Sequence, residues 1–215
     1  RKRYGAESEV VYPPVDASRF SVPEKPGAGG YYVMLGAFAP YKRVDLAIEA
    51  FERMGKRLLI GGGGELDGKL RRKVRPGGPV ELVGAVPREK IASFLGDAKA
   101  FIFPGEEGFV IAPVEGMACG LPVIAYGRGG ALESVVGLDD SHGSAPTGLF
   151  FDEQTPEALI DAVERFERAH DAFDPHAIHR HALQFDRPVF MERMRRVLAE
   201  EGFFGERPLR PVAVA

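Results

Sequence analysis

The sequence predicts an α/β fold of the Rossmann-like type, in which helices cover both faces of a parallel sheet. Short continuous apolar runs, typical of fully buried strands, recur between residues 31 and 152. Stretches with apolar residues at helical spacing separate these runs, and glycine or proline marks several of their ends. Strands that alternate with helices are typical of a parallel sheet covered on both sides.

The predicted elements follow one another from residue 31. A strand at 31–36, a helix at 43–54 and a strand at 56–64 form a first strand-helix-strand unit. The alternation continues with a polar helix at 64–74, a strand at 79–84, a helix at 87–97, a strand at 99–105, a helix at 113–119, a strand at 121–126, a short helix at 130–136 and a strand at 148–151.

Three parts are expected along the chain. Residues 1–30 are rich in proline and glycine, with one short apolar piece, and are interpreted as a linker that leads into the domain. Residues 31–152 form the Rossmann-like core that binds the ligand. Residues 153–215 hold only helices that complete the same domain: one follows the N-cap Thr155 and Pro156, and another follows Asp186. Because the sequence does not begin with Met, we expect it to start inside a longer polypeptide.

Composition limits the possible functions. The 215 residues are 45% hydrophobic and 27% charged, enough for a buried core. A net charge of −3 argues against a nucleic-acid partner. Cys119 is the only cysteine, which excludes an internal disulfide and fits a reducing compartment. No apolar run reaches the ~20 residues that span a bilayer, and the first residues do not resemble a signal peptide. We therefore expect a soluble cytoplasmic protein.

Ligands of such a sheet bind beyond the carboxyl ends of its strands, where helix N-termini point. The first candidate loop ends a strand at Gly36 and carries Lys42 just before a helix, where an ammonium group suits a diphosphate. The alternative for Lys42 is an ordinary surface lysine. The second loop, Gly61 to Gly64, either lets the backbone approach a ligand or makes a tight turn.

The third candidate loop holds two acids. Glu107 follows a buried strand, and Glu115 follows eight positions later near a helix start. The helix dipole favours a carboxylate early in a helix, but this explanation covers Glu115 alone. It leaves Glu107, and the glycine after it, to be explained by a ligand.

Other residues have simpler interpretations. Cys119 is expected to be a buried packing residue rather than a nucleophile. His176, His179 and His181 lack nearby acids at metalloenzyme spacing, so we expect surface or packing roles and no metal site. The helix predicted from residue 186 has an apolar face with basic residues, which fits packing within the protein better than the alternative, a peripheral contact with the inner face of a membrane.

Several motifs of the sequence resemble those of a known enzyme family. "EGFVIAPVE" resembles the E-x7-E motif of retaining GT-B glycosyltransferases of glycosyltransferase family 4 (glycosyl transferases group 1), and "VEGMACGLPVIA" resembles its continuation. Similarity extends in order to "APYKRVDLAIEAFERMG", "LLIGGGGEL", "GGALESVV" and "TGLFFDEQTPEAL", over about residues 11–198. The family has two Rossmann-like domains facing a cleft. This sequence resembles only the C-terminal, donor-binding half of the GT-B fold.

The resemblance implies roles for these residues. Glu115 would accept hydrogen bonds from the ribose hydroxyls of a nucleoside diphosphate sugar, and Glu107 would lie beside the sugar and its reacting carbon. Lys42 would contact the diphosphate and stabilise the leaving group, so that neither a metal ion nor a cofactor is expected. Further donor contacts would come from Gly36 at the strand end, from Val86 near the base, and from the backbone N–H groups of Phe109, Val110 and Ile111.

Two positions depart from the family pattern. Ala37 stands where an arginine is common, a deficit that Arg43 could fill, and Val110 replaces the second glycine of a G-F-G sequence. Glu133 matches a recurrent family acid, although a helix-start role explains it equally well.

The expected function is donor binding in a retaining hexosyltransferase. Its GDP- or UDP-linked sugar would be transferred to a carbohydrate or lipid-linked acceptor held by a missing N-terminal domain. Similarity at "PYKRVDLAIEAF" favours a mannosyltransferase-like enzyme of polysaccharide or lipopolysaccharide synthesis. Two alternatives stay open: a non-catalytic nucleotide-binding or scaffold module that has kept the fold, and a GT-B epimerase.

Overall fold

The computed structural model describes residues 9–140 and 143–200. Within them, six parallel strands form one sheet in the order β3-β2-β1-β4-β5-β6. The chain order reverses beside β1, because β2 lies on one side of it and β4 on the other. The strands are β1 (Tyr32–Ala37), β2 (Leu58–Gly63), β3 (Val80–Gly84), β4 (Phe101–Phe103), β5 (Val123–Tyr126) and β6 (Gly148–Phe151).

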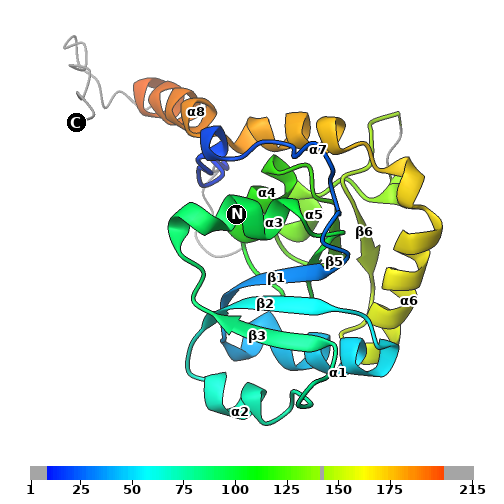
Figure 1. The fold of residues 1–215 in the computed structure, drawn as a ribbon. Helices are drawn as coiled ribbons and strands as arrows, with labels where there is room; N and C mark the ends of the chain where they lie inside the picture. Colours follow the sequence, from blue (N-terminus) through cyan, green and yellow to red (C-terminus); the bar gives the residue numbers. More distant parts are fainter. Residues whose placement is uncertain (1–8, 141–142, 201–215) are drawn as a thin grey trace.

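Helices cover both faces of this sheet (Figure 1). Helix α1 packs against α6, and α4 packs against α7 on the opposite face. The helices are α1 (Val44–Met54), α2 (Asp67–Arg71), α3 (Ile91–Gly96), α4 (Ile111–Ala118), α5 (Ala131–Ser134), α6 (Pro156–Arg168), α7 (Pro175–Ala182) and α8 (Arg187–Glu200). The structure therefore confirms the predicted Rossmann-like α/β architecture.

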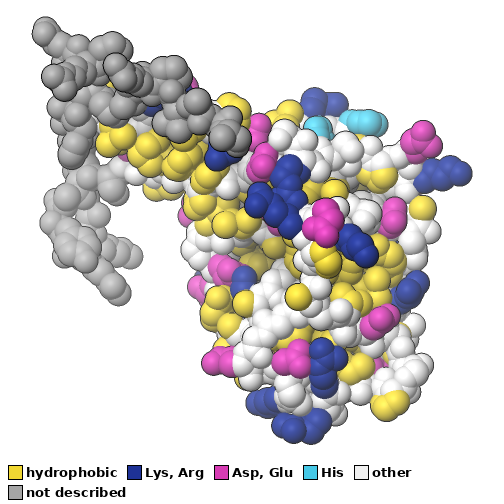
Figure 2. Space-filling model, turned by 60° about the vertical axis from the view of Figure 1, so that its left-hand side comes forward, with side chains coloured by type: hydrophobic (Ala, Val, Ile, Leu, Met, Phe, Trp, Pro, Cys, Tyr) yellow, Lys and Arg dark blue, Asp and Glu magenta, His cyan; other side chains and the backbone are white. Residues whose placement is uncertain are grey.

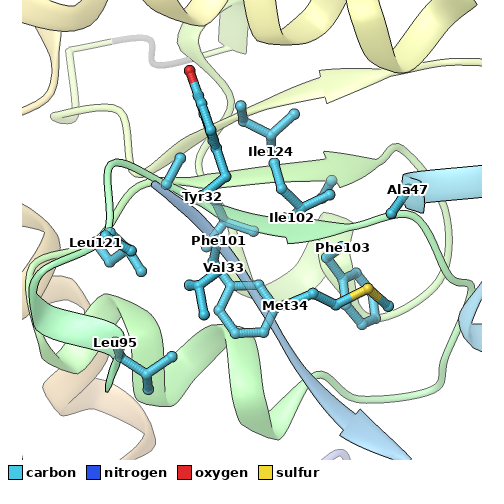
Figure 3. Packing of buried hydrophobic residues seen from close by; sticks show 14 of the residues in the cluster. Tyr32, Val33, Met34, Ala47, Leu95, Phe101, Ile102, Phe103, Leu121 and Ile124 are labelled. Carbon is cyan, nitrogen blue, oxygen red and sulfur yellow. The ribbon is translucent and has the colours of Figure 1, made fainter. Parts of the chain in front are cut away.

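The core lies where the central strands meet these two helix layers (Figure 3). Alternate residues of a strand point to opposite faces. Tyr32 accordingly packs its ring against Phe51 of α1 and Phe166 of α6. The next residue, Val33, points to the other face, toward Leu95 of α3. Both faces of β1 are thus buried, which explains its continuous apolar sequence.

Two helices begin at the predicted N-caps. The side-chain oxygen of Thr155 accepts a hydrogen bond from the Ala158 N–H at 3.2 Å and begins α6. Asp186 accepts from the Arg187 N–H at 2.8 Å at the start of α8. The structure also divides the helix expected at 87–97 into a short 3-10 turn, η3 (Arg88–Lys90), and α3.

The segment that leads into the domain is packed against it. Residues 9–30 are mostly irregular, apart from a 3-10 turn, η1 (Ala17–Arg19). Val15, Ala17 and Phe20 are nevertheless buried. The Val15 N–H donates to the Phe185 carbonyl at 2.9 Å, and the Ala17 N–H donates to the Asp186 carboxylate at 3.0 Å. This segment is thus hydrogen-bonded to the residues that directly precede α8.

Helix α8 extends away from the sheet and its covering helices (Figure 1). Figure 2 shows hydrophobic side chains along this arm, and none of its described residues is buried. In the described part of the chain, no helix combines the length and the apolar character needed to cross a membrane. Residues 1–8, and residues 201–215 at the end of the predicted helical segment, lie outside the described ranges.

Candidate functional site

Two predicted site residues meet where the strand order reverses. Lys42 ends the 3-10 turn η2 (Pro40–Lys42) after β1, and Glu107 lies in the loop after β4. The Lys42 Nζ lies 2.5 Å from the Glu107 Oε1, and both side chains are less than one-fifth exposed. Parallel strands β1 and β4 end at the same edge of the sheet, which brings these distant residues together.

A cavity of about 490 Å³ opens beside this ion pair. Loops that follow β1, β4, β5 and β6 contribute to it, so it lies at the carboxyl edge of the sheet. A groove in this position is where ligands of doubly wound sheets bind. Its lining residues are Tyr41, Arg43, Glu106, Glu107, Gly108, Gly129 and Gln154.

Arg43 lines this cavity in an unusual backbone conformation. Its φ of 51° and ψ of 39° are left-handed, and it is the one non-glycine residue with positive φ among those the structure describes. Its guanidinium donates to the Gln154 Oε1 at 3.1 Å, while the Gln154 Nε2 donates to the Pro104 carbonyl at 2.7 Å. Gln154 thus links the loops after β1, β4 and β6. The sequence analysis did not identify Gln154, because no neighbouring sequence pattern indicates these distant partners.

The loop between β4 and α4, residues 105–110, carries Glu107 and is called the acid loop below. The Gly130 N–H donates to the Glu107 carbonyl at 2.7 Å. A Cβ on Gly130 would lie 2.5 Å from the Gly108 carbonyl oxygen, and one on Gly129 would lie 2.5 Å from that of Glu107. Glycines 129 and 130 therefore let the start of α5 press directly against the acid loop.

The three residues that follow Gly108 face different ways. Phe109 packs its ring among other aromatic rings, and Val110 is only 1% exposed. The Val110 side chain is therefore buried and does not project into the solvent beside Glu107. Ile111 is the first residue of α4 and is exposed. The first N–H groups of a helix have no partner within it, so the start of α4 offers donors beside Glu107.

Glu115 lies one turn further along α4 and does not line the cavity beside the ion pair. Burial raises the pKa of its carboxyl, and the charges of Arg19 and Arg88 partly oppose that rise. Arg19 donates to the Arg88 carbonyl at 2.8 Å, which ties η1 to η3 near Glu115. Sequence analysis missed both arginines, because they come from segments far apart in the chain.

The glycines after β1 and β2 make close backbone contacts. A Cβ on Gly62 would lie 1.8 Å from the Gly36 carbonyl oxygen, and one on Gly61 would lie 2.6 Å from a methyl group of Val86. The position of a Cβ on Gly36 is 3.7 Å from the Lys42 Nζ. The tight approach of two strand ends therefore accounts for these glycines, and it places Val86 over β2.

The remaining candidates have structural partners. Cys119 is buried, and burial raises the pKa of its thiol to about 12. Ring nitrogens of His179 and His181 lie 2.6 Å and 2.8 Å from the backbone carbonyls of Ala118 and Ser134. Glu133 lies close enough to Tyr12 to raise the pKa of its hydroxyl. Within residues 9–140 and 143–200, no three His, Cys, Asp or Glu side chains are placed to hold a metal ion together.

A doubly wound parallel sheet with helices on both faces and a groove at its reversal point defines a domain of the Rossmann-like class. The chain matches the family Glycosyl transferases group 1 over residues 17–179, which is more than half of its length. It therefore belongs to the glycosyl transferases group 1 family, as the sequence motifs predict.

Two curated relatives show how much of such proteins the chain represents. It is 34% identical over 140 residues to an uncharacterized glycosyltransferase of Methanocaldococcus jannaschii, covering 64% of this chain and 38% of the relative. It is 31% identical to a GDP-mannose-dependent alpha-(1-6)-phosphatidylinositol monomannoside mannosyltransferase of Mycolicibacterium smegmatis, covering 74% and 46%. The chain thus spans less than half the length of these relatives.

Solved structures share the fold at low identity. Sucrose-phosphate synthase from Thermosynechococcus elongatus superposes with a TM-score of 0.77 at 20% identity, covering 94% of this chain and 55% of that one. The Anabaena protein HepE, solved in complex with UDP-glucose, gives 0.73 at 19% identity, covering 89% and 57%. The chain therefore has the fold of one half of a GT-B glycosyltransferase.

Proposed function

We propose that this chain is the donor-binding half of a retaining, metal-independent glycosyltransferase. The observation that carries the proposal is the Lys42 and Glu107 pair at the reversal point of the sheet. The enzyme would transfer a hexose from a nucleoside diphosphate sugar to a carbohydrate or lipid-linked acceptor. That acceptor would be held by a second domain, since the chain covers less than half of its curated relatives.

Each residue of the pair has a separate task in this proposal. The Lys42 ammonium binds the diphosphate and stabilises the negative charge that grows on it as the bond to the sugar breaks. It provides positive charge where other enzymes use a metal ion. Glu107 accepts hydrogen bonds from the sugar, close to its reacting carbon. The free N–H groups at the start of α4 add further stabilisation, because they are fixed before the reaction begins.

The rest of the donor extends along α4 in this proposal. The Glu115 carboxylate accepts from the two ribose hydroxyls, since its two oxygens match a vicinal diol. Val86 contacts the base from the loop after β3, and Arg19 and Arg88 lie close enough to Glu115 to oppose the rise in its pKa. Arg43 supports the site through Gln154 instead of replacing the family arginine directly.

The sugar and base are proposed from similarity. The 31% identical relative of Mycolicibacterium smegmatis is named as GDP-mannose-dependent, which favours GDP-mannose as donor and a mannosyltransferase-like activity. HepE shows that a protein of this fold binds UDP-glucose, so a UDP-linked donor is the competing choice. A lipid-linked acceptor would bring the enzyme to the inner face of a membrane from the cytoplasm.

Calorimetry on the 215-residue chain tests this function. We expect binding of GDP or UDP with no requirement for divalent metal, and weaker binding in Glu115→Ala. Glu24→Ala, at an exposed acid that does not line the cavity, is the matched control. Equal affinities of Glu115→Ala and the wild type would remove the ribose assignment. An affinity that disappears on addition of EDTA would remove metal independence.

Ala37 favours one alternative function. It is exposed at the end of β1, and the Arg43 guanidinium binds Gln154 instead of taking the place of the missing arginine. A domain with a weaker hold on the diphosphate could serve as a nucleotide-binding or scaffold module without turnover. The two functions differ in the full-length protein. The enzyme hydrolyses the donor slowly and loses this activity in Glu107→Ala, whereas the module shows no hydrolysis.

A further inference from the structure

An aromatic cluster holds the outer side of the acid loop. It consists of Tyr12, Phe109 and Phe185, and the ring centroids of every pair lie 5.6 Å apart. The ring of Tyr12 stacks on Phe109 at 23°, while Phe185 meets the two rings at 69° and 58°. These are favourable geometries for aromatic pairs.

The three rings come from distant segments. Tyr12 precedes β1, Phe109 belongs to the acid loop, and Phe185 ends the 3-10 turn η6 (Leu183–Phe185) before α8. The Val15 N–H bond to the Phe185 carbonyl fixes the first segment to the last one. Phe109 is thus held from outside by two segments that are themselves tied together.

Tyr12 also lies near a second element that supports the acid loop, helix α5. The carboxylate of Glu133 on α5 lies close enough to the Tyr12 hydroxyl to raise its pKa. The start of α5 in turn binds the acid loop, through the Gly130 N–H and the Glu107 carbonyl. Tyr12 therefore stacks on Phe109 and lies near α5, and Phe109 and α5 support the acid loop from its two sides.

The loop needs such support because of its composition. Glycines 105 and 108 flank Glu107, and glycine gives the backbone its largest freedom. Open space surrounds the Cβ position of Gly108, while its backbone carbonyl lies against the start of α5. The aromatic ring two residues beyond Glu107 is the anchor that restricts it from the far side.

We propose that Tyr12 is a positioning residue of the donor site, which places the acid loop by stacking on Phe109 next to Glu133 of α5. The inference rests on the proposed function, since it takes Glu107 to face the donor sugar. Tyr12 itself touches no substrate. Its removal shifts the carboxylate of Glu107 and the N–H groups behind it, and so acts on the sugar more than on the nucleotide.

Calorimetry of two donors and their nucleotides tests this role. UDP-glucose, UDP, GDP-mannose and GDP are titrated into the wild type, Tyr12→Ala, Tyr12→Phe and the control Phe173→Ala. Phe173 packs against Phe166, with centroids 5.4 Å apart, away from the acid loop. Tyr12→Ala is expected to lose affinity for the sugar nucleotide roughly three- to tenfold beyond any loss for the free nucleotide. Tyr12→Phe keeps the ring and recovers most of this loss.

A purely structural role predicts a different pattern. In that case Tyr12→Ala lowers the melting temperature as Phe173→Ala does, and the affinity ratio between sugar nucleotide and nucleotide stays that of the wild type. Such a result would overturn the proposal.

Hydrogen exchange of the acid loop provides a readout that needs no ligand. In Tyr12→Ala, backbone amides of residues 105–110 are expected to exchange faster than in the wild type and in Phe173→Ala. Unchanged exchange there contradicts the positioning role, even if the donor assignment holds. Absence of binding of all four ligands to the wild type contradicts the proposed function, while the exchange data still decide whether Tyr12 holds the loop.

Discussion

Lys42 and Glu107 form an ion pair with their Nζ and Oε1 atoms 2.5 Å apart, although 64 residues separate them in the sequence. The cation proposed for the diphosphate is therefore partly neutralised by the carboxylate proposed for the sugar. A donor has to draw Lys42 toward its diphosphate, which in turn leaves Glu107 free to accept hydrogen bonds from the sugar. In the proposed function, binding of the nucleotide part and placement of the sugar are thus coupled through one bond.

This coupling predicts opposite effects of two substitutions. Lys42→Ala is expected to weaken binding of GDP or UDP at least about tenfold, because a charge-assisted hydrogen bond is lost. Glu107→Gln is expected to strengthen it roughly two- to fivefold, because Lys42 no longer leaves a charged partner. Calorimetry measures both, and Lys42→Ala/Glu107→Gln should bind as weakly as Lys42→Ala alone. Glu106→Gln, an exposed neighbour in the same loop, controls for net charge. An equal gain in both glutamine variants would show a general charge effect only.

Glu115 is predicted to lower the stability of the folded protein at neutral pH while it contributes to nucleotide binding. Burial raises its pKa, so the folded protein holds this proton more tightly than the unfolded chain does. The stability contribution is therefore highest at low pH, and it falls as the pH rises from the usual value of 4.5 through the raised pKa.

Glu115→Gln should remove this loss. At pH 7 the variant is expected to melt ~1–3 °C above the wild type, with the difference vanishing near pH 4, while its nucleotide affinity falls. Thermal melting across pH 4–8 and calorimetry measure the two effects, with Glu24→Gln as an exposed control. A variant that melts below the wild type at neutral pH would contradict the burial argument.

Much of the fold could be predicted because its signals are local. Continuous apolar runs mark the buried strands, and the cap formed by Thr155 lies within four residues of its partner. No helix was predicted specifically at the position of α7. Only Ile178 and Ala182 are buried in it, which is too short a pattern to show helical periodicity. Its cap was readable, since Asp174 accepts from the His176 N–H ahead of a helix that opens with proline.

The site was predictable only as far as its motifs extend. Lys42 and Glu107 were found because both stand at strand ends that a parallel sheet must bring to one edge. Gln154 and Tyr12 were not predicted, because their partners are distant in the sequence. Gln154 binds Pro104 and Arg43, which are 50 and 111 residues away, and Tyr12 stacks on Phe109. No local sequence pattern indicates such contacts. The same distance explains why Arg19 and Arg88 were not expected beside Glu115.

A second pH effect is predicted at Glu167 on α6. Burial raises the pKa of its carboxyl, but hydrogen bonds from Lys56 at 2.6 Å and Tyr32 at 2.8 Å outweigh it, together with the charges of Lys56 and Lys99, and the net pKa is lowered. For an acid with a lowered pKa, the stability is present above the usual value of 4.5 and is lost as the pH falls through the lowered pKa.

Glu167→Gln should therefore melt ~1–3 °C below the wild type at pH 7, and the two should converge toward pH 3. Melting curves between pH 3 and 7 measure this difference. Glu164→Gln on the same helix is the control, because its ion pair with Arg168 spans 3.9 Å and both side chains are exposed. Parallel curves for the wild type and Glu167→Gln would mean that this network contributes nothing to acid sensitivity.

The contact between α5 and the acid loop leads to the most selective prediction. Gly130 has a helical backbone, with φ of −64° and ψ of −13°, so alanine fits its conformation without strain. Alanine does not fit the space, because its Cβ would lie 2.5 Å from the Gly108 carbonyl oxygen and 2.8 Å from the Phe109 Cα. Gly130→Ala must therefore push the acid loop away from α5, and we expect it to weaken binding of a sugar nucleotide at least about tenfold. Gly68→Ala in α2 is the matched control, since its Cβ meets nothing within 4 Å and alanine favours a helix. If both variants bind the donor as the wild type does, the position of the acid loop does not govern donor binding.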